Sequence, residues 1–177
     1  MRNFFIIFAL ISFSNLTFSQ KEKTTKSKKW DVNNPHKDWN YKNFNLKTDE
    51  GTWMNLDISP DGETIVFDML GDIYTMPITG GKAKALRTGL AYEVQPRYSP
   101  DGTYISFTSD AEGGNNIWVM TADGTNAKAI TKEKFRLLNN AVWTPDGKSL
   151  VARKHYTSQR SVGAGEMWQY PLVGSAG

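Results

Sequence analysis

The sequence contains no cysteine and only two histidines, His36 and His155. The absence of cysteine excludes disulfide bonds, thiolate metal sites and thiol nucleophiles. The two histidines form neither a His-x-His nor a His-Glu-x-x-His pattern, so we expect no metal centre within this chain. A Gly-x-Ser-x-Gly nucleophile elbow, a phosphate-binding loop and a dinucleotide fingerprint are also missing. These absences predict no catalytic residue, no metal ligand and no cofactor-binding residue in this chain.

Long hydrophobic runs are missing as well. The main apolar stretch, Phe4–Phe13, is too short for a membrane span, which needs about 20 residues. It follows the positively charged Arg2 and precedes Thr17 and Ser19, two small residues at the spacing of a signal-peptidase site. We therefore expect residues 1–19 to be a cleaved secretory signal, in preference to an uncleaved anchor or a buried core segment. The mature protein would then be exported, periplasmic or secreted, with no stable membrane span.

Residues 20–40 are rich in lysine and poor in side chains that could pack, which predicts a flexible basic linker. This linker explains the net charge of +3, because residues 1–38 contain seven Lys or Arg against three Asp or Glu, whereas residues 39–177 contain fourteen against fifteen. A basic tail could contact nucleic acid. A lysine run with few aromatic residues is more often a tether, so we expect no nucleic-acid partner.

A four-residue turn occurs three times in the rest of the chain, at 59–62 (SPDG), 99–102 (SPDG) and 144–147 (TPDG). Proline presets the first corner of a type I turn, and glycine supplies the left-handed residue that lets two twisted strands return antiparallel. Each copy therefore predicts a β-hairpin. The turn aspartates are 40 and then 45 residues apart, a period expected for one four-stranded propeller blade.

Matching residues extend well beyond the turn. Apolar residues recur four positions before, three after and five after each turn glycine, which predicts two strands with one buried face. These positions hold Ile58, Tyr98 and Trp143; Ile65, Ile105 and Leu150; and Phe67, Phe107 and Ala152. A third matched strand follows at 72–76, 116–120 and 166–170, and a short fourth strand at 83–87 and 127–131.

Hairpin-linked strands repeated at this period predict an all-β fold, a partial β-propeller of about three four-stranded blades with the last incomplete. Three unrelated hairpins of a β-sandwich are the alternative, and the matching beyond the turn disfavours it. The expected propeller domain covers residues 41–177, with blades at 52–88, 92–131 and 139–177.

The repeat has two irregularities. The connection between the second and third strands lengthens from copy to copy, and in the third copy the insert His155–Gly165 predicts a longer loop on one face. The third copy also has no fourth strand. Since propellers close with four to eight blades, we expect an N-terminal fragment whose main partner is the rest of its own polypeptide. We expect Tyr41–Lys47 to pair with the last blade of that protein.

Several side chains are candidates for chemistry. The turn aspartates Asp61, Asp101 and Asp146 could be calcium ligands, but their place in a Pro-Asp-Gly corner favours a structural role. Four tryptophans could line a sugar site, although matched strand positions favour packing between blades for at least three of them: Trp53, Trp118, Trp143 and Trp168. Four basic residues near strand ends are candidates for a polar rim: Arg97, Arg153, Lys154 and His155.

The three turns, together with the strands IYTM, IWVM and MWQY, resemble the WD-like β-propeller repeats of the TolB type. The longer strings DEGTWMNLDISPDG, QPRYSPDG, NNIWVMTADG and FRLLNNAVWTPDG look more specifically like the N-terminal propeller of secreted bacterial amidohydrolases, over about residues 30–170. That resemblance implies a metal-dependent hydrolase barrel, with a divalent metal, after the propeller. The metal ligands of that family lie in the barrel, and no position of this sequence matches them.

We therefore expect a binding and scaffolding module of a secreted or periplasmic amidohydrolase, with a small molecule or peptide as substrate. One alternative is a non-enzymatic TolB-like interaction protein of the cell envelope, whose reading frame would end soon after the last blade. Another is the propeller cap of a prolyl-oligopeptidase-like serine peptidase, for which a downstream nucleophile elbow is expected.

Overall fold

The structure is a computed structural model and describes residues 32, 35, 42, 45–134, 136–156 and 164–173. Within these ranges the chain forms eleven strands and no helix, which confirms the all-β prediction. The described chain accordingly contains no helix long and apolar enough to cross a membrane. The predicted signal peptide, and all but two residues of the predicted linker, lie outside the described residues, so both stay predictions.

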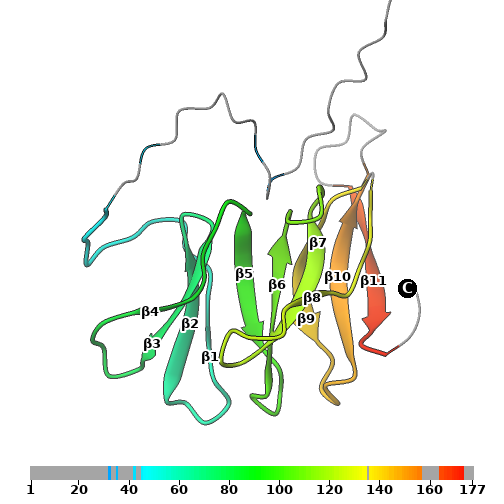
Figure 1. Ribbon diagram of the computed structural model, residues 1–177. Helices are drawn as coiled ribbons and strands as arrows, with labels where there is room; N and C mark the ends of the chain where they lie inside the picture. The colour runs from blue at the N-terminus through cyan, green and yellow to red at the C-terminus, as the bar shows by residue number, and fades with distance from the viewer. Residues whose placement is uncertain are drawn as a thin grey trace, which may run out of the picture.

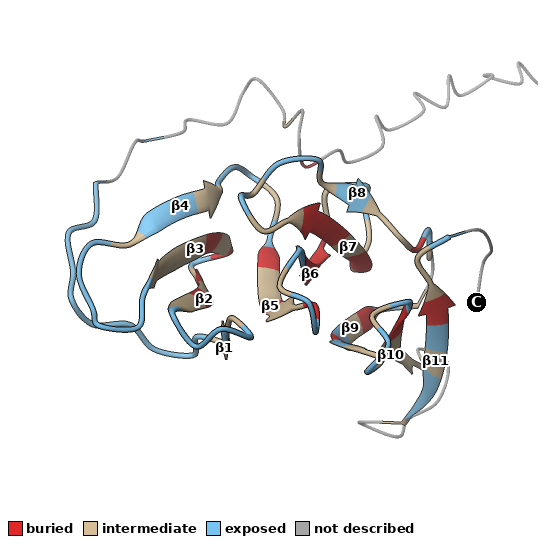
Figure 2. Ribbon diagram, turned by 90° about the horizontal axis from the view of Figure 1, so that it is seen from below, coloured by how far each residue is buried: buried red, intermediate tan, exposed pale blue. Residues whose placement is uncertain are grey.

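The strands form three antiparallel sheets, in which each strand is paired with the next along the chain. Blade 1 contains β1 (Leu56–Ile58), β2 (Thr64–Met69), β3 (Asp72–Pro77) and β4 (Lys84–Arg87). Blade 2 contains β5 (Glu93–Tyr98), β6 (Tyr104–Ser109), β7 (Asn116–Thr121) and β8 (Lys128–Ala129). Blade 3 contains β9 (Leu138–Trp143), β10 (Ser149–His155) and β11 (Gly165–Pro171). The sheets fan out with β1, β5 and β9 at the inner edge and β4 and β8 outside, which is the predicted partial β-propeller (Figure 2).

The repeated turns lie together at one rim of the arc, at the bottom of Figure 1, which we call the lower rim. Gly62, Gly102 and Gly147 have φ values of 75°, 73° and 67°, in the left-handed region that glycine adopts without strain. Each glycine donates its N–H to the carbonyl oxygen three residues earlier, at 2.8 to 2.9 Å. The turns thus reverse the chain as the sequence predicts.

Two apolar clusters hold the blades together. The first fills the junction of blades 1 and 2 and contains Val66, Ile73, Ile105, Phe107 and Met120. The second fills the junction of blades 2 and 3 and contains Ile117, Val119, Leu138, Ala141, Leu150, Ala152 and Tyr170. Every one of these side chains is at most 6% exposed, so the core lies between the sheets and not within any one of them.

Strand β6 differs from the prediction of one buried face, because all five residues of Ile105–Ser109 are buried. The middle blade is covered on both sides. Ile105 and Phe107 face blade 1, whereas the alternate residues Ser106 and Thr108 face blade 3. Ile58 differs in the opposite sense: it is 47% exposed, since no described blade precedes blade 1.

Hydrogen bonds at the inner edge link one blade to the next. Asp68 of blade 1 is 3% exposed, and its carboxylate accepts the backbone N–H of Asn55 at 3.1 Å and that of Gln95 at 2.6 Å. The side-chain oxygen of Gln95 in turn accepts the hydroxyl of Thr108 at 3.0 Å and the backbone N–H of Asn140 at 2.9 Å. An amide residue stands seven positions before each turn glycine, namely Asn55, Gln95 and Asn140. The hydrogen bonds at Gln95 and Asn140 continue the link from blade 1 through blade 2 to blade 3.

The connections between second and third strands lie at the opposite rim, which we call the upper rim (Figure 1). They comprise residues 70–71, 110–115 and 156–164, so the predicted lengthening occurs on one face of the arc. Residues 157–163 of the longest loop lie outside the described residues. In the segment predicted to pair with the last blade, residues 42 and 45–47 are described and form no strand here.

Candidate functional site

The innermost strands converge on a cleft near the lower rim, which we call the inner cleft. Its volume is about 320 Å³. Prolines of the first two turns form part of its wall, and the strands contribute Asp57 and Ile58 from β1, Arg97 and Tyr98 from β5, and Val142 and Trp143 from β9. Residues from all three blades therefore meet in one hollow.

Hydrogen bonds between blades fix the polar groups of the inner cleft. Arg97 reaches back to blade 1, where its Nη1 donates to the carbonyl oxygen of Leu56 at 2.8 Å. Asp57 reaches forward, and its Oδ2 accepts the backbone N–H of Tyr98 at 2.8 Å. From blade 3, Trp143 Nε1 donates to the carbonyl oxygen of Arg97 at 3.0 Å. The cation, the anion and the indole are thus held in place before any ligand binds.

The inner cleft has groups suited to binding. A guanidinium, a carboxylate and two aromatic rings can hold a peptide-like segment through charge, hydrogen bonds and ring contacts. Burial raises the pKa of Tyr98 above its ordinary value. Its phenol is protonated at neutral pH, as in any tyrosine, and can donate a hydrogen bond. Ser99 donates its hydroxyl to Asp101 at 2.6 Å, and neither histidine nor lysine is among the described residues that line the cleft. The Ser99 hydroxyl is therefore engaged within its own turn.

The turn aspartates each stabilise their own hairpin. One carboxylate oxygen accepts the Ser or Thr hydroxyl two residues earlier and the backbone N–H two residues later, in Asp61, Asp101 and Asp146. These hydrogen bonds, above all those from the hydroxyls, lower the pKa of all three carboxyl groups. The turn between β7 and β8 repeats the arrangement at Asp123, where the Thr121 hydroxyl is the main cause of a pKa lowered to about 2.

The tryptophans divide into two groups. Trp118, Trp143 and Trp168 lie on matched strand positions and pack against the two junction clusters, as the sequence predicts. Trp53 precedes β1, belongs to neither cluster and is 97% exposed. The tryptophans therefore do not form one sugar-binding surface.

The residues predicted to form a polar rim lie at both rims of the arc, the lower and the upper. Arg97 is near the lower end of β5, in the inner cleft. Arg153, Lys154 and His155 are at the upper end of β10, where the chain enters its longest connection. They do not form one site, because the strand that holds Arg97 runs from the upper rim to the lower, and β10 runs in the opposite direction.

At the upper rim, Lys154 and His155 make contacts within blade 3 and with the segment that leads into it. Lys154 Nζ lies 2.6 Å from a carboxylate oxygen of Glu133 and 4.3 Å from the ring centroid of Trp168. His155 Nε2 lies 3.0 Å from the side-chain oxygen of Asn139. These contacts brace the strand that leads into the longest loop.

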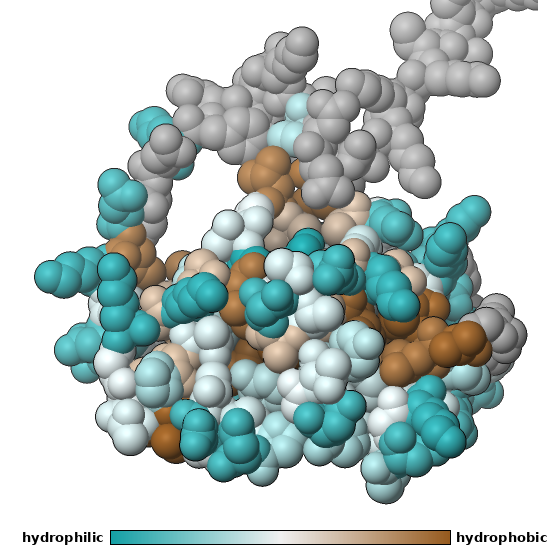
Figure 3. Space-filling view, turned by 60° about the horizontal axis from the view of Figure 1, so that its bottom comes forward, coloured by the Kyte–Doolittle hydropathy of each residue, from teal (hydrophilic) through white to brown (hydrophobic). Residues whose placement is uncertain are grey.

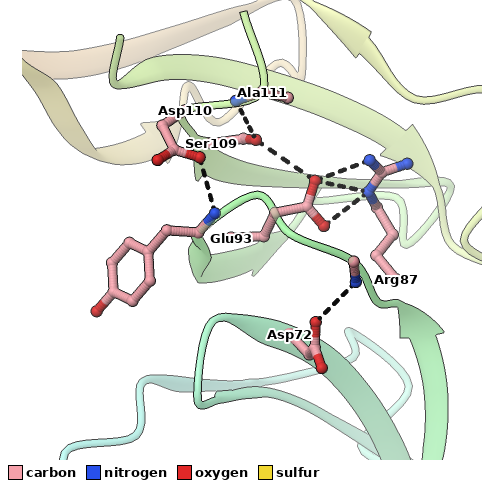
Figure 4. A network of polar contacts seen from close by, with 8 residues as sticks. Asp72, Arg87, Glu93, Ser109, Asp110 and Ala111 are labelled. Carbon is pink, nitrogen blue, oxygen red and sulfur yellow. Dashed lines mark hydrogen bonds and ion pairs between the residues drawn. The ribbon is translucent and has the colours of Figure 1, made fainter. Parts of the chain in front are cut away.

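The junction of blades 1 and 2 contains a polar network that the sequence analysis missed (Figure 4). Glu93 is 3% exposed and accepts hydrogen bonds from Nε and Nη2 of Arg87 at 2.7 to 2.9 Å. The Ser109 hydroxyl is 3.4 Å from the same carboxylate, and the guanidinium lies 5.5 Å from the Phe107 ring centroid. The only sequence signal is a pair of opposite charges six residues apart, which is equally common at exposed surfaces.

No three His, Cys, Asp or Glu side chains gather in a metal-binding group within the described part of the chain. His36 lies outside the described residues. The expectation that this chain holds no metal or cofactor stays a prediction.

Three fanned sheets with a cleft at their inner edge define a β-propeller module. The profile of the Tricorn protease N-terminal beta propeller domain matches residues 53–176. The chain belongs to this family.

Two curated relatives and one solved structure show the range of similar proteins. Tricorn protease homolog 1 of Streptomyces coelicolor is 32% identical over 92 residues, which cover 52% of this chain and 9% of the relative. An uncharacterized protein of Agrobacterium fabrum is 36% identical over 81 residues, covering 44% of this chain and 28% of the relative. A putative TolB from Agrobacterium tumefaciens is 26% identical with a TM-score of 0.56, over 63% of this chain and 42% of that one. The match thus spans less than half the length of each of these proteins.

Proposed function

We propose that this chain is the binding and scaffolding module of a larger exported hydrolase that acts on amide bonds. The inner cleft would hold an extended, peptide-like segment, while another domain of the same polypeptide carries out the hydrolysis. The observation that carries this proposal is the preformed set of Arg97, Asp57, Tyr98 and Trp143, contributed by three blades and without a reacting group among them. The expected signal peptide at residues 1–19 supports export.

Two kinds of parent enzyme have specific support. The strings around the repeated turns resemble the propeller of secreted amidohydrolases, which would place a divalent metal in a barrel outside this chain. The relative from Streptomyces coelicolor is named as a Tricorn protease homolog and favours a peptidase. A TolB-like protein without enzymatic activity is the third possibility, supported by the solved structure of a putative TolB.

The parent enzyme is tested with the complete product of the gene, purified from the exported fraction. Hydrolysis of short peptides and N-acyl amino acids is measured with and without a metal chelator and with and without a serine-directed phosphonate. Loss of activity with the chelator supports the amidohydrolase, and loss with the phosphonate supports the peptidase. Absence of hydrolysis in every condition contradicts the enzymatic proposal and favours the TolB-like interaction protein.

The role of the inner cleft is tested by Arg97→Met in the same complete protein. A charge-assisted hydrogen bond contributes about 1.5 to 3 kcal/mol, so KM for a peptide substrate should rise about tenfold or more while kcat is unchanged. Arg136→Met is the matched control, because Arg136 lies at the upper rim with its guanidinium 4.8 Å from the Tyr156 ring centroid. Equal KM values for both variants would show that substrate does not bind in the inner cleft.

A further inference from the structure

A second hollow lies at the lower rim beside the inner cleft, and we call it the rim pocket. Its volume is about 270 Å³, and the turns of blades 2 and 3 form most of its wall. Pro100 lines both hollows, and the ring of Tyr104 in the rim pocket stacks with that of Trp143 in the inner cleft at a centroid distance of 6.5 Å. A ligand held in the inner cleft can therefore extend into the rim pocket. The lining residues are Pro100, Asp101, Tyr104, Pro145, Asp146 and Gly147.

Two carboxylates give the rim pocket its charge. In Asp101 and Asp146 the hydrogen bonds of the turn go to Oδ1, so Oδ2 can accept a further donor. The pKa of Asp146 is lowered first by the Thr144 hydroxyl and, to a smaller extent, by the charge of Lys148. Neither carboxylate forms an ion pair with a described residue. The rim pocket therefore holds two negative charges that can accept a cation.

Tyr104 distinguishes the rim pocket from the rest of the repeat. Two positions after the turn glycine, blade 1 has Thr64 and blade 3 has Ser149, whereas blade 2 has this tyrosine. A turn carboxylate recurs in every blade and stabilises its own hairpin, but the turn does not require an aromatic ring beside it. Tyr104 is 38% exposed, so part of its ring is accessible to a ligand. The face of an aromatic ring attracts cations, as the two carboxylates do.

We propose that the rim pocket binds a lysine or arginine side chain of the peptide-like segment held in the inner cleft, an inference that rests on the proposed function. Charge complementarity argues for this occupant, because both carboxylates can accept hydrogen bonds from its cationic group. Pro100 and Pro145 offer apolar walls to its aliphatic stem, and Tyr104 offers its ring. Figure 3 looks onto the lower rim, where hydrophilic surface predominates. The ligands of this module are therefore peptides that contain a basic residue.

The experiment uses the complete product of the gene and two sets of peptides. N-acetylated hexapeptides of alanine and phenylalanine contain one lysine, placed at each position in turn, and the second set contains norleucine in its place. Acetylation removes the terminal amine as a competing cation. Binding is measured by calorimetric titration in the presence of the metal chelator and the serine-directed phosphonate, which prevent hydrolysis. The best lysine peptide should bind about tenfold more tightly than its norleucine counterpart, as expected for a charge-assisted hydrogen bond.

Two variants test the rim pocket itself. Asp146→Asn should reduce the preference for lysine to about threefold or less, because asparagine keeps the acceptor that the turn uses and loses the charge. Tyr104→Thr, which introduces the residue of blade 1 at the matched position, should also reduce the preference. Asp61→Asn is the matched control, since Asp61 makes the same hydrogen bonds in its own turn and does not line the rim pocket. Its preference for lysine should equal that of the unmodified protein.

The outcomes separate this inference from the proposed function. Equal binding of the two peptide sets by the unmodified protein overturns the inference alone, provided that Arg97→Met weakens the binding of both sets and so confirms the role of the inner cleft. An equal loss of preference in Asp61→Asn and Asp146→Asn also overturns the inference, because the preference would then reflect the charge of the whole lower rim. If no peptide binds, both the inference and the proposed function are wrong.

Discussion

Replacement of Arg87 by methionine should destabilise the chain more than any comparable change at its surface. The Glu93 carboxylate at the junction of blades 1 and 2 is 3% exposed, and Arg87 supplies its three shortest hydrogen bonds. Without the guanidinium, the contact that remains among those described is the Ser109 hydroxyl at 3.4 Å. Arg87→Met therefore leaves an anion buried with almost no compensation.

The size of the effect follows from the depth of the pair. Two unit charges about 4 Å apart attract by about 4 kcal/mol at an effective dielectric constant near 20, and removing one partner of a buried pair costs about 3 to 5 kcal/mol. The free energy of unfolding of Arg87→Met should fall by about that amount. Since methionine retains most of the apolar packing of the arginine stem, lost packing contributes little to the difference.

The measurement is urea denaturation followed by tryptophan fluorescence, at one fixed protein concentration because association shifts apparent stability. Lys84→Met on the same outer strand is the control and should change stability by less than about 0.5 kcal/mol, since Lys84 is exposed. The double variant Arg87→Met with Glu93→Leu should regain most of the lost stability, because an apolar pair needs no counter-charge. A loss below about 1 kcal/mol in Arg87→Met, or no recovery in the double variant, would refute the reasoning.

Three further predictions concern the turns and the inner edge. Hydrogen bonds, first of all the one from the Ser99 hydroxyl, lower the pKa of Asp101 from 3.8. The stability that this carboxylate contributes is therefore present above about pH 4 and is lost as the pH falls through the lowered value. Asp101→Asn should accordingly have a lower unfolding free energy than the wild type at pH 7, and the difference should shrink at pH 2. Gly124→Ala should destabilise more than Gly80→Ala, by about 1 to 3 kcal/mol in thermal or urea melts, because both glycines have φ near 90° but only at Gly124 would a methyl group lie 2.9 Å from a backbone oxygen of the neighbouring blade. Asp68→Ala should accelerate amide hydrogen exchange at Gln95 at least tenfold, with little change at residues of blade 3; equal protection in variant and wild type would contradict a link through that carboxylate.

Much of the fold was predictable because the residues of the repeated turn determine its backbone conformation. A Pro-Asp-Gly corner permits few backbone paths, and the alternation of apolar residues on either side sets the strand period. The three sheets, the turn glycines with positive φ and the lengthening of one set of connections all follow from these patterns. The burial of both faces of β6 did not follow, because alternation reveals a strand and does not reveal how many neighbours it has.

The inner cleft was less predictable than the fold. Arg97 was among the candidates for a polar rim, but the sequence grouped it with Lys154 and His155, which lie at the other end of the sheets. Proximity in a propeller depends on strand direction across three blades, which residue type does not encode. The ion pair of Arg87 and Glu93 was not predicted for a related reason. Its carboxylate is buried because blade 1 packs on blade 2, and the sequence does not show that packing.

The two rims of the arc have unequal freedom to change. The hairpins at the lower rim use one turn type three times, whereas the connections at the upper rim contain two, six and nine residues between strands that remain paired residue by residue. A loop on that side can therefore gain or lose length without shifting the register of any strand. New binding surfaces can therefore arise in the loops of the upper rim, whereas the hairpins of the lower rim keep one length and one turn type.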